Sequence, residues 1–191
     1  MEPLQELIGQ VAAARQHLVH AAADLSDEQA NFKPSDEAWS IVNIIEHLVW
    51  AELGGLNKIW MAFEGIQSNN PVWTGEAIHR GLSIEDIVGK TLPSKIKSPE
   101  KLLPVWGGSI RFWIVTFQAC QAMLEVLGNA LNGADLENII YPHPFSGPLD
   151  VLQRMGLLRM HMTRHLLQIE NIKSHPDYPK SIRGIEKNHH Q

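Results

Sequence analysis

The sequence has a single cysteine, Cys120, among its 191 residues. A disulfide framework within the chain is therefore excluded, and so is a zinc module built from several cysteines. An excess of basic residues is also lacking, because 16 Lys and Arg stand against 21 Asp and Glu, for a formal net charge of -5. Non-specific nucleic-acid binding needs a basic face that displaces counterions, so the composition argues against a nucleic-acid partner.

Targeting and membrane-spanning signals are lacking as well. The N-terminus is acidic from its second residue, Glu2, and shows no basic region followed by an apolar one. The most apolar stretch, 110–127, is interrupted by charged and amide side chains, among them Arg111, Gln118 and Glu125. We therefore expect a cytoplasmic protein with no membrane partner.

Strand patterns are scarce, and apolar residues at helical spacing dominate instead. Hydrophobic residues make up 44% of the chain, enough for one domain to bury a core. The spacing predicts four amphipathic helices, over about 4–23, 40–64, 109–127 and 149–173, the third of which could start as early as 99. Four such helices predict an all-α fold, a four-helix bundle. The predicted domain covers 1–175, and 176–191 form a polar C-terminal tail.

The helix boundaries and the longest connection are also marked in the sequence. Ser40 is the predicted N-cap of the second helix, and Gly65 and Gly128 are the predicted stops of the second and third helices. Between these two helices lies a connection over 67–98 that is rich in glycine and proline, with a short amphipathic piece at 83–88. A connection of this length either shapes a pocket or is a plain surface excursion.

Ten histidines are the unusual part of the composition. His161 and His165 are four residues apart on the last predicted helix, so they share a face and could share a metal ion. The same spacing also fits two ordinary helix histidines. Met162 stands where the zinc-protease motif has a glutamate, so that motif's general base is missing. His47 is the best candidate for a third ligand, because it flanks the apolar stripe of the second helix.

Three segments resemble the motifs of one known family. The stretch WSIVNIIEHL at 39–48 resembles the second-helix motif of the DinB-like family. The stretch HMTRHLLQI at 161–169 resembles its last-helix motif H-x-x-R-H-x-x-Q-I, and HPFSGPL at 143–149 resembles the segment leading into that helix. The motifs follow one another in the family's order, and the resemblance spans roughly residues 1–175.

The resemblance implies a four-helix bundle of the DinB/YfiT-like type that binds one divalent metal ion. One histidine of the second helix and two of the last would be the ligands, which here are His47, His161 and His165. Members of the family include thiol S-transferases that use bacillithiol, a mycothiol-dependent isomerase and YfiT-like proteins regarded as metal-dependent hydrolases. Three neutral imidazoles suit Zn²⁺ or Ni²⁺, with Fe²⁺, Mn²⁺ and Cu²⁺ as further candidates, and they leave positions open for water or a thiol.

We therefore expect a metal-dependent enzyme that acts on a small molecule. The reaction would be a thiol-dependent S-transfer, with a low-molecular-weight thiol as partner, or a hydrolysis. Two alternatives remain open at this point: a non-catalytic, stress-associated metal-binding bundle, and a bundle that holds no metal.

Residues near the histidines have a functional and a structural interpretation. Gln168 shares the face of the two helix histidines and could orient one of them or a metal-bound water, or it could simply pack between helices. Arg164 could form a salt bridge or bind a substrate carboxylate. Glu46 points away from His47 and is expected to be a structural or solvated carboxylate. Cys120 is expected to be a buried thiol rather than a nucleophile.

Aromatic residues and the remaining histidines complete the expectations near the site. Trp39 and Phe145 are expected to pack at the mouth of the bundle. His143 lies beside the suspected site. The other histidines are expected at the surface or in turns: His17, His20, His79, His175, His189 and His190.

Three tryptophans bear on assembly. Trp50, Trp60 and Trp113 are more large aromatic side chains than one small bundle needs to bury. An exposed apolar patch containing some of them would favour a homodimer. The alternative is that all three fill the core.

Overall fold

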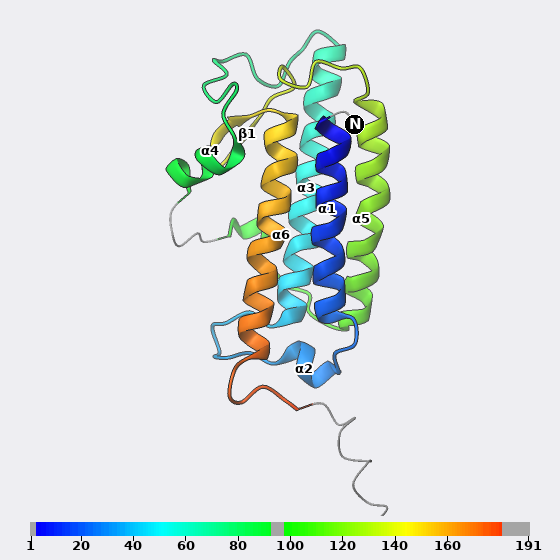
Figure 1. The fold of residues 1–191 in the computed structure, drawn as a ribbon, viewed down its shortest axis with the longest axis vertical. Coiled ribbons are helices and arrows are strands. Elements are labelled where there is room, and N and C mark those ends of the chain that lie inside the picture. The colour runs from blue at the N-terminus through cyan, green and yellow to red at the C-terminus, as the bar shows by residue number, and fades with distance from the viewer. Residues whose placement is uncertain (1–2, 93–97, 181–191) are drawn as a thin grey trace, which may run out of the picture.

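The computed structural model describes residues 3–92 and 98–180 and shows a bundle of four long helices (Figure 1). The long helices are α1 (Pro3–Ala22), α3 (Ile41–Gln67), α5 (Ile110–Ala130) and α6 (Val151–Lys173). The short elements are α2 (Asp27–Asn31), α4 (Ile84–Thr91), the 3₁₀-helix η1 (Glu100–Leu102), and the strands β1 (Tyr141–His143) and β2 (Gly147–Leu149). The predicted all-α four-helix bundle is confirmed.

The direction of the helices explains the long connection between α3 and α5. Helix α1 packs against α5 and α6, and α3 packs against the same two helices. Helices α3 and α5 run in the same direction, opposite to α1 and α6 (Figure 1). The chain between α3 and α5 must therefore return along the length of the bundle. This crossover connection, residues 68–109, confirms the predicted long connection; its residues 93–97 lie outside the described part of the chain.

Side-chain caps fix where the helices begin. Ser40 and Asn43 form a reciprocal capping box at the start of α3, which confirms the predicted N-cap, and Asp150 and Gln153 form another at the start of α6. The prediction that this helix stops at Gly65 is wrong, because α3 continues to Gln67. Gly65 is buried, and a Cβ there would lie 2.7 Å from the backbone oxygen of Asn70. The glycine therefore permits the close return of the next turn.

The third long helix agrees with the later of its two predicted starts and differs from the prediction at its end. It begins at Ile110, because Gly107 and Gly108 have φ angles of 60° and 95°, which no right-handed helix contains. It also passes Gly128, whose missing side chain makes room for Ile8 of α1. The short helix α2 was not predicted, and the rigid segment at 141–149 forms a small antiparallel hairpin. The amphipathic piece expected at 83–88 is helix α4.

The core is continuous through the four long helices. Its fully buried members include Leu18 of α1, Leu48 of α3, Phe117 of α5 and Met155 of α6.

Two of the three tryptophans flagged for assembly belong to this core. Trp113 is buried, and Trp50 packs edge-on against it with the ring centroids 5.8 Å apart. Trp60 alone of the three is exposed, at 41%. The tryptophans therefore do not together form an exposed patch.

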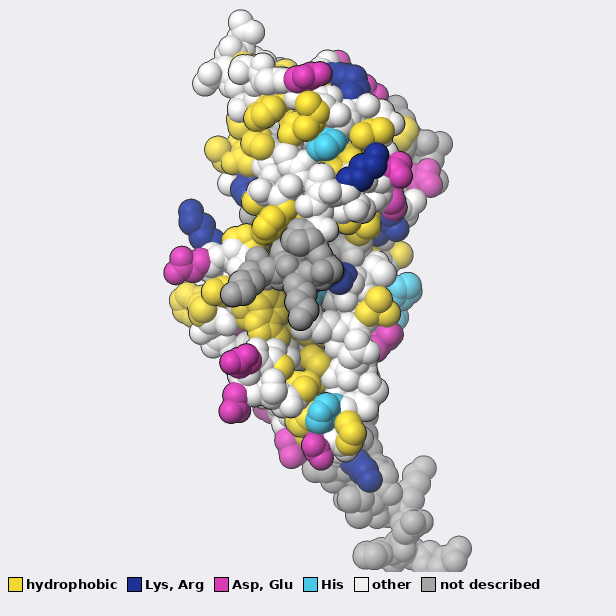
Figure 2. Space-filling model, turned by 90° about the vertical axis from the view of Figure 1, so that its left-hand side faces the viewer, with side chains coloured by type: hydrophobic (Ala, Val, Ile, Leu, Met, Phe, Trp, Pro, Cys, Tyr) yellow, Lys and Arg dark blue, Asp and Glu magenta, His cyan; other side chains and the backbone are white. Residues whose placement is uncertain are grey.

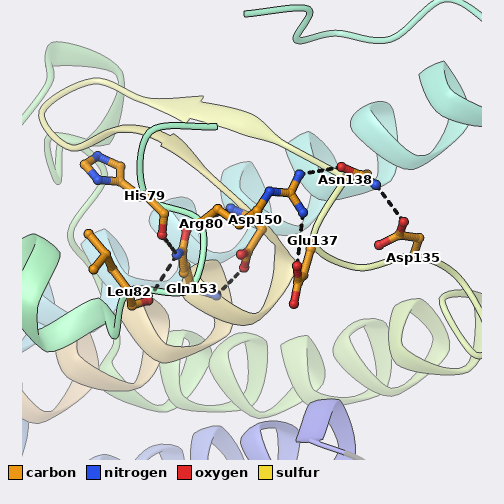
Figure 3. Close-up of polar contacts among 8 residues, drawn as sticks. All are labelled: His79, Arg80, Leu82, Asp135, Glu137, Asn138, Asp150 and Gln153. Atoms are coloured by element: carbon orange, nitrogen blue, oxygen red, sulfur yellow. Dashed lines mark hydrogen bonds and ion pairs between the residues drawn. The ribbon is translucent and has the colours of Figure 1, made fainter. Parts of the chain in front are cut away.

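Polar contacts hold the crossover connection against the start of α6 (Figure 3). Gln153 Nε2 donates to the backbone oxygens of His79 and Leu82, at 2.7 and 3.1 Å. Arg80 pairs with Glu137 at 3.0 Å. The His79 ring is 2.7 Å from the backbone oxygen of Ser146, so this histidine, which lies in a turn as one of its two expected places had it, also anchors the connection.

Helix α5 is the one helix in the described residues that is long and apolar enough, by length and composition, to cross a membrane. It packs against both α1 and α3, as a core helix of a soluble protein does. The tail expected at 176–191 is described only as far as residue 180.

Candidate metal centre

The three histidines singled out in the sequence meet between α3 and α6. His47 comes from the second turn of α3, and His161 and His165 come from successive turns of α6. The Nε2 atom of His161 is 3.2 Å from Nε2 of His47 and 3.0 Å from Nε2 of His165, and the ligand nitrogens all lie within 4.8 Å of one another. Nitrogens on a tetrahedral zinc ion are separated by about 3.3 Å, given Zn–N bonds of about 2.0–2.1 Å. The spacing therefore fits one shared divalent ion.

Hydrogen bonds fix which nitrogen of two of these rings carries the proton. Nδ1 of His47 is 2.7 Å from the backbone oxygen of Leu102, and Nδ1 of His165 is 2.9 Å from Oε1 of Gln168. Both partners are acceptors, so each Nδ1 must donate. The lone pairs are then on the Nε2 atoms, which face the centre of the cluster. Gln168 thus makes the contact that orienting a histidine requires, which was the first of the three possibilities given for it.

Burial keeps the cluster uncharged. Burial is the largest cause of the lowered pKa of each histidine. It lowers the pKa of His165 to about 3 and that of His161 well below the ordinary value. It also lowers the pKa of His47, where the hydrogen bond to Leu102 opposes the shift. The nearby cation of Arg164 lowers all three further. Neutral imidazoles at neutral pH are the form that binds a metal ion.

Glu46, the neighbour of His47, holds the crossover connection in place. Its fully buried carboxylate accepts hydrogen bonds from the backbone N–H groups of Val105, Trp106 and Gly107, at 2.8 to 2.9 Å. Of the two roles expected for Glu46, a structural carboxylate or a solvated one, the structure shows the structural role. The same stretch of chain supplies the Leu102 carbonyl that orients His47.

Arg164 and Trp39 border the cluster on two sides. Nη2 of Arg164 is 3.2 Å from Nε2 of His165, so the guanidinium lies at the edge of the site rather than in a distant salt bridge. The Trp39 indole stacks on the His165 ring, with centroids 6.3 Å apart and planes at 13°, and its centroid is 4.9 Å from that of His47. One side of the site is thus an apolar wall, and another carries a cation.

His143, Phe145 and Cys120 lie outside the cluster. Nδ1 of His143 accepts from the backbone N–H groups of Phe145 and Ser146, at 3.4 and 3.2 Å, so this histidine caps the hairpin turn. Phe145 is partly exposed beside it. Cys120 is a buried thiol, as predicted, and burial raises its pKa to about 12, which leaves it unreactive as a nucleophile.

The face of the molecule that carries α4 and the crossover connection has a mixed character (Figure 2). Hydrophobic side chains alternate there with both acidic and basic ones. On the described part of this face we see no continuous basic patch of the kind that nucleic-acid binding requires.

Sequence comparisons identify the family of the chain. The profile of the DinB superfamily matches residues 10–169, a range that includes all three histidines. The chain is 28% identical over 162 residues to the uncharacterized protein YuaE of Bacillus subtilis (strain 168), an alignment that covers 78% of this chain and 86% of YuaE. No solved structure gives a significant match. The predicted family is thus confirmed, and the chain belongs to the DinB superfamily.

Proposed function

We propose that the chain is a metal-dependent enzyme in which His47, His161 and His165 hold one divalent ion. The observation that carries the proposal is the convergence of three neutral imidazoles on one point, with two of the tautomers fixed by hydrogen bonds. This donor set suits Zn²⁺ or Ni²⁺ best, with Fe²⁺, Mn²⁺ and Cu²⁺ as further candidates.

The proposed reaction is a thiol-dependent S-transfer or a hydrolysis of a small molecule. A divalent ion with three neutral ligands would supply uncompensated positive charge, which lowers the pKa of a thiol or water bound beside it. Arg164, at the edge of the cluster, would bind an anionic group of the substrate. Trp39 would keep bulk water from one side of the site. Because low-molecular-weight thiols are kept reduced in the cytosol, we place the reaction there.

Metal analysis tests the site. Protein purified without an affinity tag and reconstituted with Zn²⁺ or Ni²⁺ should retain about one ion per chain. His47→Ala, His161→Ala and His165→Ala should each lose it, with the far-UV helical signal unchanged. His17→Ala, on an exposed position of α1, should bind like the wild type. A wild-type protein that retains no ion after reconstitution would refute the site.

Activity assays test the chemistry. The metal-loaded protein is offered an electrophilic acceptor with a panel of low-molecular-weight thiols, and separately a panel of esters and amides. Turnover that needs both metal and thiol supports S-transfer, and turnover that needs metal alone supports hydrolysis. Arg164→Gln should then raise KM for anionic substrates more than it lowers kcat, whereas Arg80→Gln, far from the cluster, should change neither. Metal binding without turnover of any substrate would favour the non-catalytic alternative.

A further inference from the structure

Helix α5 has two apolar faces, and only one of them is buried in the bundle. The inner face contributes Trp113, Phe117 and Leu124 to the core. The outer face carries Phe112, Val115, Met123 and Val126, which are 48% to 67% exposed, with the exposed Ala119 and Ala122 between them. We call these six residues the α5 stripe. Single exposed apolar residues are ordinary, but a continuous row of them along a helix marks a surface that binds something.

The spacing of the α5 stripe is that of a helix–helix seam. Five of its members, at 112, 115, 119, 122 and 126, are separated alternately by three and four residues. This is the spacing by which one helix packs along another, and the two central alanines allow a close approach of the partner helix. Polar residues border one edge of the stripe at seven-residue intervals: Arg111, Gln118 and Glu125.

We propose that the α5 stripe is the interface of a homodimer, in which α5 packs antiparallel against α5 of a second copy. Arg111 and Glu125 are equally far from Gln118 in the sequence. In an antiparallel pair centred near Gln118 and Ala119, each Arg111 therefore faces the Glu125 of the other copy. A parallel pair would instead turn this edge toward the opposite edge of the partner helix, so that Arg111 and Glu125 would not meet. The order of charges thus selects a self-complementary, twofold arrangement.

A register centred one residue further along, at Ala119, also matches the apolar residues. With the twofold axis near Ala119, each Phe112 meets the other copy's Val126, each Val115 meets Met123, and the two Ala119 side chains face each other. Large side chains at both ends of the seam then close around a narrow centre. The resulting contact runs along most of α5, a helix of 21 residues.

A second copy suits this surface better than a lipid bilayer. Helices that lie on membranes carry rows of Lys and Arg beside their apolar face. The edge of the α5 stripe carries one Arg, one Gln and one Glu, and a bilayer offers no partner to the carboxylate. The histidine cluster lies between α3 and α6, so pairing through the outer face of α5 does not cover it. The proposal therefore does not depend on the metal site.

Solution mass tests the dimer. At micromolar concentration, light scattering and sedimentation equilibrium should give twice the chain mass of 21.4 kDa. Ala119→Glu would place two carboxylates face to face near the axis and should weaken the dimer at least roughly a hundredfold. Ala13→Glu makes the same change at an exposed alanine of α1 and should leave the dimer intact. Both positions are exposed, so unchanged far-UV spectra are expected.

Charge exchange tests the orientation. Arg111→Glu and Glu125→Arg should each weaken the dimer by roughly tenfold, because each creates two like-charged contacts. The double variant should restore the wild-type dissociation constant to within about twofold, since the pairs are then reversed but complementary.

Three results would overturn the proposal. The first is a wild-type protein that stays at the mass of one chain at every concentration. The second is a dimer that Ala119→Glu leaves unchanged, or one that the double charge exchange fails to restore. The third is a monomer that sediments with anionic phospholipid vesicles and loses this binding in Ala119→Glu, which would assign the stripe to a membrane instead.

Discussion

Two of the polar clusters buried in the described part of the bundle are built in opposite ways. One is the set of three histidines between α3 and α6. The other joins Arg15 of α1 to Glu52 of α3 and Gln121 of α5, where the buried Arg15 donates to both partners. In the Arg15 cluster donors meet acceptors, and a cation meets an anion. In the histidine cluster the Nε2 lone pairs of His47 and His165 converge on the Nε2 atom of His161.

The difference distinguishes a polar cluster that stabilises the fold, that of Arg15, from one suited to bind a ligand, that of the histidines. A buried charge is tolerated when its partner comes from the same chain, as Glu52 does for Arg15. Converging nitrogen lone pairs need a proton, a metal ion or a hydrogen-bond donor, and Nη2 of Arg164, 3.2 Å from Nε2 of His165, is such a donor at the edge of the cluster. Burial opposes protonation of the rings by lowering the histidine pKa values. Helix α3 contributes to both clusters, with His47 and Glu52 five residues apart.

Breaking the Arg15 cluster should have the largest effect. Arg15→Met should lower the free energy of unfolding by about 3–5 kcal/mol, because it leaves Glu52 buried without a partner. Burial already raises the pKa of Glu52 from 4.5 to about 7, although the Arg15 cation opposes this rise. Without Arg15 the pKa of Glu52 should be higher still. Since the folded carboxyl then binds its proton more tightly than the unfolded one, the variant should become less stable as the pH rises through that window. Urea unfolding at several pH values measures both effects.

Two further variants control this prediction. Arg80→Met removes the exposed pair with Glu137 and should cost less than about 1 kcal/mol. The double replacement of Arg15 by Met and Glu52 by Leu should recover most of the lost stability, because an apolar pair can replace a buried ion pair at little net cost. Equal losses in Arg15→Met and Arg80→Met would show that burial does not distinguish these pairs.

The histidine cluster should respond in metal affinity rather than in stability. Gln168→Leu removes the acceptor for the Nδ1–H of His165 and should weaken metal binding about 10- to 100-fold. Gln168→Glu restores an acceptor at the same place and should bind at least as tightly as the wild type. Competition with a chromophoric chelator measures these constants, and Gln16→Leu, on an exposed position of α1, is the control. An unchanged affinity in Gln168→Leu would leave Gln168 a packing residue.

The smallest effect is expected at His143. This residue tests whether a lowered histidine pKa by itself identifies a metal ligand, because His143 has one but lies outside the cluster. Burial, helped by Arg154 and Lys58, lowers the pKa of His143 to about 4. The unfolded chain takes up this proton near pH 6.5, so the contribution of His143 to stability is complete above that pH and is lost as the pH falls toward 4. His143→Asn keeps an acceptor for the turn but does not titrate. Across this window the metal-free variant should lose about 1 kcal/mol less than the wild type, a value reduced for partial exposure.

Thermal unfolding of the metal-free protein across this pH window measures the difference. His17→Asn, at an exposed position, should leave the pH dependence unchanged. A variant whose stability depends on pH as the wild type's does would show that the folded and unfolded states bind the His143 proton equally.

What the sequence predicts well is local. The spacing of His161 and His165 fixes their common face once the helix is known, and the position of His47 beside an apolar stripe points it inward. The N-cap at Ser40 is also a local signal, since its partner Asn43 is three residues away.

What the sequence does not predict depends on the path of the crossover connection. The Leu102 carbonyl that orients His47 is a backbone group, 55 residues further along the chain, and no side chain marks it. Glu46 could be assigned as structural or solvated, but its three backbone donors come from that same distant stretch. Arg15 lies on an amphipathic helix like many exposed arginines, and only the packing of α3 and α5 against it brings Glu52 and Gln121 within reach.

The adjacent residues Glu46 and His47 both hold the stretch 102–107, and this couples ligand binding to topology. A chain whose crossover returned along another side of the bundle would keep two histidines on α6, but its His47 ring would lose the carbonyl that sets its tautomer. Two ligands bind a divalent ion far more weakly than three. If the proposed site binds its ion, tight metal loading would therefore distinguish correctly threaded chains from misthreaded ones, and retention of the ion would report on the quality of folding.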